Sequence, residues 1–323
     1  MELQLKNIGM IKEANIKLRG LTVIAGENDT GKSTAGRAFY YAVENKLLDK
    51  NSNANSIGIG TIIGFGLGLL GGGWGAVAGA TLGTVYQDRL RKVTSLNIED
   101  NEKLANPILI ETPYSLNNAN YIKTTQLMAS QKGLKFILGD HIIDLILQMS
   151  QTPTLKSSAL YLRMQEIIDG RVYYDEERDN FFYYKESIDK ELGMDSTATG
   201  IKMFGFLQIL LLNKTIKEGT VLILDEPEVH LHPKWQLKYA EFLIELIKNG
   251  VNILVTSHSP YMIEALERYG EKAEINMDFY LAEDGFIDKV EDNNSKTLAK
   301  IFHKLSAPYE TFNQMDSETL KGG

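Results

Sequence analysis

The sequence contains no cysteine, and it carries little positive charge for its length. The absence of cysteine excludes disulfide bonds, thiolate zinc sites and cysteine nucleophiles. Against 42 aspartates and glutamates stand 34 lysines and arginines, for a net charge of −8. A broad basic surface for nucleic acid is therefore not expected, although a local basic groove is compatible with these totals. The N-terminal residues alternate polar and apolar and do not resemble a signal peptide, so we expect a cytoplasmic location.

Residues 51–87 lack any charged residue, and residues 56–86 are almost wholly apolar, with eleven glycines. Many of these glycines recur every four residues, a small-xxx-small pattern that lets helix backbones approach closely. In an isolated helix eleven glycines would cost on the order of 10 kcal/mol relative to alanine. We therefore predict a glycine-zipper hairpin, within an insertion at 51–92, that is stabilised by something outside itself.

Three environments would stabilise this hairpin. It could re-enter a membrane, pack against copies of itself in a soluble oligomer, or pack within its own subunit. Basic residues flank both ends, which agrees with both ends lying on the cytoplasmic side of a membrane. Each arm would be about 20 Å of helix, short of the roughly 30 Å hydrocarbon core, so a simple crossing is not expected.

The rest of the chain alternates short apolar runs with helix-like segments, which predicts an α/β fold. An apolar fraction of 43% is enough for a sizeable core. The alternation implies a mostly parallel sheet flanked by helices, with a site at the carboxyl ends of the strands. Predicted strands lie within 2–18 (two strands), 21–25, 107–113, 220–224, 251–255 and 279–287, and predicted helices at 35–48, 200–217, 234–248 and 294–305, followed by a tail.

Residues 115–195 are predicted to form a lid subdomain within this single domain of 323 residues. Its first part is helical, and 171–174 and 181–184 read as a β-hairpin that pairs aromatic side chains across its strands. A base-stacking platform is the alternative reading of these aromatic residues, and we favour the hairpin.

A P-loop follows the apolar run 21–25. Residues 26–34 match the pattern G-x-x-x-x-G-K-[ST], between a predicted strand and a predicted helix, which is the context that makes the motif specific. Its backbone N–H groups would surround phosphate oxygens, Lys32 would contact the β- and γ-phosphates, and Ser33 would ligate Mg²⁺. The predicted ATP-binding residues are Gly26, Asn28, Asp29, Thr30, Gly31, Lys32, Ser33 and Thr34.

Two further strands end in polar residues that suit nucleotide hydrolysis. The run 221–224 delivers Asp225, a second candidate Mg²⁺ ligand, and Glu226, which could polarise a water for attack on the γ-phosphate. After the run 251–255 comes His258, where an imidazole could contact the γ-phosphate and respond to its loss. Glu226 and His258 are the predicted catalytic residues.

Residues 225–233, read together with 256–260, resemble the ABC-type ATPases of the SMC/RecF class, and in particular the short OLD-like (AAA family) ATPases of bacterial anti-phage systems such as retron and Septu modules. The resemblance covers nearly the whole chain except 51–92. It implies an ABC-type head in which two subunits sandwich two ATP molecules. The residues implied for the signature, which would complete the partner subunit's site, are Ser196, Thr197, Thr199, Gly200 and Lys202.

The same resemblance implies a D-loop at the dimer interface formed by Glu228, His230 and His232, for which a metal site is the alternative reading. The chain departs from the usual Leu-Ser-Gly-Gly signature, so the hydroxyl that contacts phosphate stays open among those of Ser196, Thr197 and Thr199. Glu111 is a weak candidate for the Q-loop position. His141 and His303 show no partners in the sequence and are read as ordinary.

The favoured function is a Mg²⁺-dependent, ATP-hydrolysing dimeric switch that controls a separate effector subunit in anti-phage defence. No nuclease motif is evident, which is why a separate effector is implied by analogy. One alternative is a membrane-engaging effector whose segment 56–86 inserts in a membrane under ATPase control, and the same segment could instead support a higher oligomer. A second is a DNA-repair ATPase, which the charge does not support.

Overall fold

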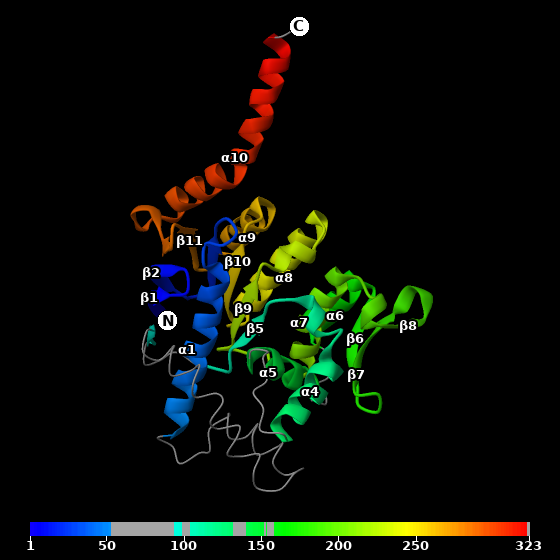
Figure 1. Cartoon of the computed structure of the whole chain (residues 1–323). Helices are drawn as coiled ribbons and strands as arrows, with labels where there is room; N and C mark the ends of the chain where they lie inside the picture. The colour runs from blue at the N-terminus through cyan, green and yellow to red at the C-terminus, as the bar shows by residue number, and fades with distance from the viewer. Residues whose placement is uncertain (53–93, 99–103, 132–139, 152, 154–157, 322–323) are drawn as a thin grey trace.

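The computed structural model describes residues 1–52, 94–98, 104–131, 140–151, 153 and 158–321 (Figure 1). The predicted glycine-zipper hairpin at 56–86 lies outside these residues. Within them, no helix is both long enough and apolar enough to cross a lipid bilayer.

Nine strands of the described chain form one sheet, which is mostly parallel as predicted. Strands β5, β9, β10, β3 and β11 run parallel to one another, and the N-terminal strands pair antiparallel at the other edge. In spatial order the strands are β4 (Thr94–Asn97), β1 (Glu2–Ile8), β2 (Ile11–Lys17), β12 (Phe286–Asp288), β11 (Met277–Glu283), β3 (Leu21–Ala25), β10 (Asn252–Ser257), β9 (Val221–Asp225) and β5 (Ile108–Ile110).

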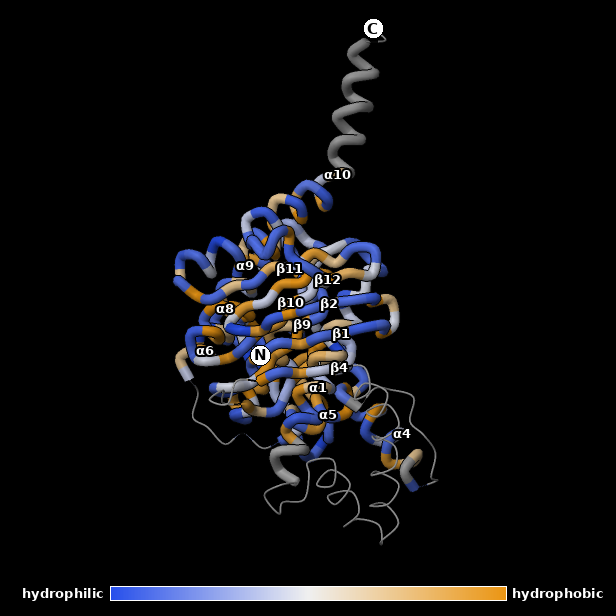
Figure 2. Tube along the Cα trace, turned by 90° about the vertical axis from the view of Figure 1, so that its left-hand side faces the viewer, coloured by the Kyte–Doolittle hydropathy of each residue, from blue (hydrophilic) through white to orange (hydrophobic). Residues whose placement is uncertain are grey.

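Helices cover both faces of this sheet, because its central strands are apolar on both sides. In β9, Leu222 and Leu224 belong to one buried cluster and Ile223 to another. The first cluster is covered by α7 (Thr199–Leu212), α8 (Pro233–Lys248) and α9 (Pro260–Lys272), and the second by α1 (Lys32–Ser52). Figure 2 shows hydrophobic residues concentrated on β9 and β10 at the centre of the molecule. Continuous apolar strands of this kind are typical of parallel sheets buried on both sides.

Residues 113–196 form the helices and the hairpin that the sequence predicts, with a second, three-stranded sheet (Figure 1). Tyr173 faces Phe182 and Tyr174 faces Phe181 across the hairpin, with ring centroids 6.2 Å and 5.1 Å apart, so the pairing is confirmed. The elements are η1 (Pro113–Ser115), α4 (Ala119–Gln131), α5 (Asp140–Met149), α6 (Ala159–Ile168), β6 (Gly170–Asp175), β7 (Asn180–Lys185), η2 (Glu186–Ile188), β8 (Lys190–Gly193) and η3 (Met194–Ser196).

The C-terminal region differs from the prediction in two ways. Helix α9 was missed because its N-cap, Ser259, and first residue, Pro260, were read only as part of the His258 cluster. Helix α10 (Asn294–Lys321) continues to the end of the described chain and leads away from the sheet, where the sequence predicted a tail after residue 305 (Figure 1). Its first turns pack on the core through Leu298 and Ile301. The short helices η4 (Pro227–His230) and η5 (Val290–Asp292) complete the described elements.

Candidate nucleotide-binding site

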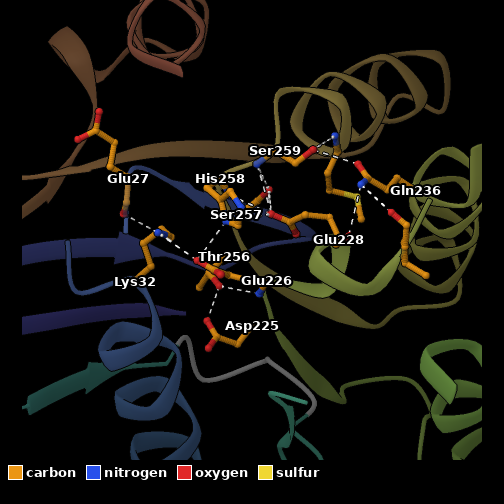
Figure 3. A network of polar contacts seen from close by, with 12 residues as sticks. Glu27, Lys32, Asp225, Glu226, Glu228, Gln236, Thr256, Ser257, His258 and Ser259 are labelled. Atoms are coloured by element: carbon orange, nitrogen blue, oxygen red, sulfur yellow. Dashed lines mark hydrogen bonds and ion pairs between the residues drawn. The ribbon is translucent and has the colours of Figure 1, made fainter. Parts of the chain in front are cut away.

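The three motifs meet at one edge of the sheet because the strands that precede them are parallel neighbours. Residue Ala25, which leads into the P-loop, pairs with Ser257, and Asp225 pairs with Thr256. The P-loop, the acidic pair after β9 and the His258 loop after β10 therefore lie together (Figure 3). This convergence at the carboxyl ends of parallel strands is the arrangement predicted from the sequence.

The P-loop backbone has the left-handed residues that an anion-binding loop requires. Asp29 has a φ of 65° and Gly31 a φ of 94°. A β-carbon at Gly31 would also lie 2.9 Å from Ile11 Cγ1. Both the positive φ and this close contact therefore disfavour any residue other than glycine. Helix α1 begins at Lys32, three residues earlier than predicted, which puts Lys32 and Ser33 in its first turn. Helix N-terminal N–H groups and a loop with alternating handedness both favour phosphate.

Lys32 is held inside the site by oxygen atoms. The residue is 4% exposed, and its Nζ donates to the Glu27 carbonyl oxygen at 2.7 Å. The same Nζ lies 3.2 Å from Glu226 Oε1 (Figure 3). The P-loop cation and the predicted catalytic carboxylate are therefore direct neighbours, as a shared γ-phosphate site requires.

Asp225 and Ser33 form the donor set for a cation. The two side chains are hydrogen-bonded to each other, and Thr256 Oγ1 donates to Asp225 Oδ1 at 2.5 Å. Burial raises the pKa of Asp225, and the hydrogen bonds from Thr256 and Ser33 only partly offset this effect. A carboxylate and a hydroxyl are hard oxygen ligands of the kind Mg²⁺ binds alongside phosphate and water, so the residues fit this ion. A divalent cation here would stabilise the ionised carboxylate.

Glu226 adopts a left-handed backbone conformation, with a φ of 46°, which is uncommon for a residue other than glycine. Its N–H donates to the carbonyl and hydroxyl oxygens of Thr256, each at 3.1 Å. This turn directs the carboxylate toward Lys32 and toward His258, whose Nδ1 lies 3.4 Å from Glu226 Oε1. Backbone strain of this kind is concentrated at functional sites.

The residues assigned to the D-loop differ in how exposed their side chains are. Glu228 is 3% exposed and turns into its own subunit, so its carboxylate does not face a partner as the interface reading implied. His232 is exposed, and its Nδ1 accepts the Lys234 N–H at the start of α8, a helix-capping role. The His230 side chain lies outside the described atoms. Among the side chains that the structure describes, which do not include that of His230, no group of three or more histidines and acids could hold a metal ion.

The predicted signature residues stand around the N-terminus of α7. Ser196 is exposed, whereas Thr197 is buried and its hydroxyl donates to the Gly193 carbonyl oxygen at 2.9 Å. Lys202 is 2% exposed, with its Nζ 5.8 Å from the centre of the Tyr114 ring, and burial lowers its pKa. In this conformation the Thr197 and Lys202 side chains point inward, so neither is presented to a partner's phosphate, and their assignment to the signature stays a prediction.

The first turn of α7 remains suited to an anion. Its N-cap is Ala198, which offers no side-chain acceptor, and the turn holds no acidic residue. Gly200 is half-buried, and a β-carbon there would lie 3.0 Å from the Trp235 ring, so glycine lets α7 pack against α8. The positive end of a helix that has no capping side chain attracts negative charge.

We expect Ala198→Asp to make the protein more stable and less active. Ala198 has extended backbone angles, φ −59° and ψ 141°, that suit a capping aspartate. The new carboxylate should stabilise the fold by about 1 kcal/mol and occupy the place that a partner's γ-phosphate would take. Denaturant unfolding and phosphate release measure the two effects. Reduced stability together with full ATPase activity would contradict the assignment of this helix end.

Glu111 lies between the P-loop helix and the lid helices, and sequence reasoning missed its partners. Glu111 Oε1 accepts from Arg37 Nε at 2.5 Å, and Oε2 lies 2.8 Å from His141 Nε2. Tyr41 OH lies 3.4 Å from His141 Nδ1. His141 is thus a buried member of a network, contrary to its reading as partnerless, whereas His303 is exposed on α10. These residues come from three separate segments, so no local pattern could have joined them.

The Glu111 network should contribute a pH-dependent part of stability. Burial raises the pKa of Glu111, but the bonds from His141 and Arg37 outweigh it and leave the pKa below its usual value. The stabilisation is then full above the unfolded-state pKa and is lost as pH falls through the lower, folded-state pKa. Glu111→Gln should lower the unfolding free energy by about 1–3 kcal/mol at pH 7.

Denaturant unfolding of both proteins from neutral to acidic pH checks this expectation. The difference between them should hold between pH 7 and about 5 and shrink in more acidic solution. A difference that grows on acidification would show that the carboxylate is not the stabilising form.

Comparison with known proteins agrees with the fold and the site. A family described as AAA domain, putative AbiEii toxin, type IV toxin–antitoxin system, matches residues 99–264, more than half of the chain and inclusive of Asp225, Glu226 and His258. The Septu protein PtuA of Bacillus thuringiensis is 48% identical over 48 residues, which is 15% of this chain and 12% of PtuA. The match thus spans a small part of that protein.

Solved structures are similar to this chain only at low identity and with TM-scores below 0.5. An ATP-binding cassette of an ABC transporter in its ADP conformation is 14% identical, with 95% of this chain and 99% of the cassette covered and a TM-score of 0.41. An SMC head bound to the C-terminal winged-helix domain of ScpA is 12% identical, with 89% and 95% covered and a TM-score of 0.44. On the family match, the chain belongs to the AAA-domain family described as putative AbiEii toxin of type IV toxin–antitoxin systems.

Proposed function

We propose that this protein is a Mg²⁺-dependent ATPase that closes as a homodimer on ATP and thereby controls a separate effector subunit in anti-phage defence. The observation that carries the proposal is the position of Glu226, between Lys32 at 3.2 Å and His258 at 3.4 Å. The strand that delivers Glu226 also delivers Asp225, hydrogen-bonded to Ser33. One site thus combines Lys32 for phosphate with the oxygen ligands of Ser33 and Asp225 for Mg²⁺. The Glu226 carboxylate and the His258 imidazole lie beside them.

The chemistry follows from these positions. Mg²⁺ held by Ser33 and Asp225 would neutralise charge on the β- and γ-phosphates. Lys32 would exchange its contact with Glu226 for the γ-phosphate, which frees the Glu226 carboxylate to orient a water and accept its proton. His258 would contact the γ-phosphate from the neighbouring strand.

A second copy is needed to bring the signature to this site. Within one subunit the first turn of α7 packs near Trp235 and Leu231 of the α8 region, not on the P-loop. Two apolar side chains beside the catalytic residues are exposed, Val229 at 53% and Tyr261 at 58%. Both side chains are available for contact with a second copy.

The effector and the defence role rest on resemblance. Septu protein PtuA shares part of this sequence, and the motifs resemble those of OLD-like ATPases. Association with a membrane and higher oligomers through residues 56–86 remain proposals that the described chain does not address. Location in the cytoplasm is an expectation of the same kind.

Retention of a partner from the native host tests the switch. We expect the Glu226→Gln protein with Mg²⁺ and ATP to co-purify with a different set or amount of partner than the Lys32→Ala protein, because only the first can hold ATP. Repeating both with residues 56–86 deleted shows whether that segment carries the contact. If the wild-type protein released no phosphate from ATP in the presence of Mg²⁺, the proposed ATPase activity would be refuted.

A further inference from the structure

One buried carboxylate close to the site has no role in the mechanism above. Glu228 lies two residues after Glu226, in η4, and is 3% exposed. Carboxylates are rarely buried to this extent unless something pairs with them. Its position therefore needs a physical account.

A single oxygen of Glu228 fixes the loop that carries His258. Glu228 Oε1 accepts hydrogen bonds from Ser257 Oγ at 2.6 Å, from the His258 N–H at 2.9 Å and from the Ser259 N–H at 3.3 Å (Figure 3). Gln236 on α8 braces the same segments, since its Nε2 donates to the Glu228 carbonyl oxygen and its Oε1 accepts from Ser259 Oγ. The loop after β10 is thus held by three hydrogen bonds to one buried carboxyl oxygen. Burial raises the pKa of Glu228, and the hydrogen bonds from Ser257 and the His258 N–H offset this effect only in part.

Two buried polar atoms beside these bonds have no hydrogen-bond partner in the described chain. They are the second carboxylate oxygen of Glu228, Oε2, and Nδ1 of His258. The imidazole Nδ1 stands between two carboxylates: it lies 3.4 Å from Glu226 Oε1 without forming a hydrogen bond, and 3.8 Å from Glu228 Oε1, beyond hydrogen-bond distance. Leaving a buried polar atom unpaired is costly, so each such atom calls for a physical explanation.

Movement of Glu226 would allow His258 Nδ1 to form a hydrogen bond with Glu228. When Glu226 turns to a water, His258 loses its nearer carboxylate, and a shift of under ~1 Å would bring Nδ1 within hydrogen-bond distance of Glu228. A carboxylate on one ring nitrogen fixes the orientation and tautomer of an imidazole and leaves the other nitrogen for the substrate. With both ring nitrogens protonated, Nδ1–H would donate to Glu228 and Nε2–H would donate to a γ-phosphate oxygen.

We propose that Glu228 is a positioning residue for His258: its negative charge holds Nδ1 during hydrolysis, so that Nε2 meets the γ-phosphate. The inference rests on the proposed ATPase function. The charged groups that face the imidazole are the carboxylates of Glu226 and Glu228. Lys32 pairs with the first of them.

The variant Glu228→Gln separates charge from packing. Because Oε1 makes all three loop contacts and Oε2 makes none in the described chain, a glutamine can place its amide oxygen at Oε1 and keep those bonds. We expect normal folding, a nucleotide Kd within twofold of wild type, and a fall in kcat of about 10- to 100-fold, because Glu228 does not contact nucleotide. Glu264→Gln, an exposed acid on α9 paired with Arg268, is the matched control and should leave all three unchanged.

A spectroscopic readout keeps the test independent of turnover. Imidazole ¹⁵N shifts of labelled histidine, assigned to His258 with a His258→Asn variant, report which ring nitrogen carries the proton. We expect these shifts to differ between wild type and Glu228→Gln and to be equal between wild type and Glu264→Gln.

Unchanged kcat and unchanged His258 shifts in Glu228→Gln would overturn the inference and leave Glu228 as a scaffold for the loop alone. If wild type shows no ATPase activity, the proposed function fails, and the ¹⁵N shifts still decide whether Glu228 orients the imidazole.

Discussion

Glu226→Gln is expected to abolish ATP turnover while ATP binding is preserved. The glutamine keeps the shape of the side chain but cannot accept a proton, and general-base catalysis contributes about 10²- to 10⁴-fold in rate. It also removes the negative charge 3.2 Å from Lys32 Nζ, so the lysine is freer to contact phosphate and affinity for ATP should hold or rise. Phosphate release and a nucleotide titration measure the two quantities on the same preparation.

The control for this variant is Glu264→Gln, which removes an acid that lies away from the site and should keep full turnover. Phosphate release by Glu226→Gln at the wild-type rate would remove the role assigned to this carboxylate. Loss of ATP binding by the same variant would instead show that Glu226 holds the site together.

Lys32→Ala is expected to abolish nucleotide binding. The lysine is 4% exposed and its ammonium is anchored by the Glu27 carbonyl oxygen, so it is already directed at the place where the phosphates would lie. Loss of a charge-assisted contact to two phosphates should weaken binding by roughly hundredfold or more. Turnover should fall with it, since binding precedes hydrolysis.

A titration with ATP and Mg²⁺ by calorimetry checks the loss, with Lys248→Ala as the control for removal of an exposed lysine at the far end of α8. Equal affinity of Lys32→Ala and wild type would mean that the P-loop does not bind phosphate. Because Glu226 is 25% exposed at its side chain, it can be solvated when the lysine is gone, and the fold should persist.

The sequence was sufficient for the central parallel strands and for the residues at their carboxyl ends, whereas β4 at the edge of the sheet was not predicted. Apolar runs followed by polar residues locate β3, β9 and β10 to within one or two positions, and parallel neighbours must end together. The meeting of Lys32, Asp225 and Glu226 follows from this local pattern. The parts that were missed depend on contacts between distant segments, as with Arg37, Glu111 and His141.

The direction in which side chains point was the other feature that could not be predicted from the sequence. Thr197 and Lys202 carry suitable groups in a suitable place, but the turn of η3 and the register of α7 point both inward. Glu228 was assigned to an interface from its neighbours in sequence, whereas the left-handed turn at Glu226 directs it into its own subunit. Motif spacing predicts where such residues lie along the chain, and the backbone turn decides which way they face.

In the proposed dimer, ATP joins two copies, with Ala198 of one facing the P-loop of the other. Light scattering on Glu226→Gln, and on Glu226→Gln combined with Ala198→Asp, measures whether ATP changes the oligomeric mass. We expect Mg²⁺ and ATP to double the mass of the single variant, and the double variant to bind ATP without this change. A single variant whose mass ignores ATP, or a double variant that doubles equally, would contradict the proposed dimer.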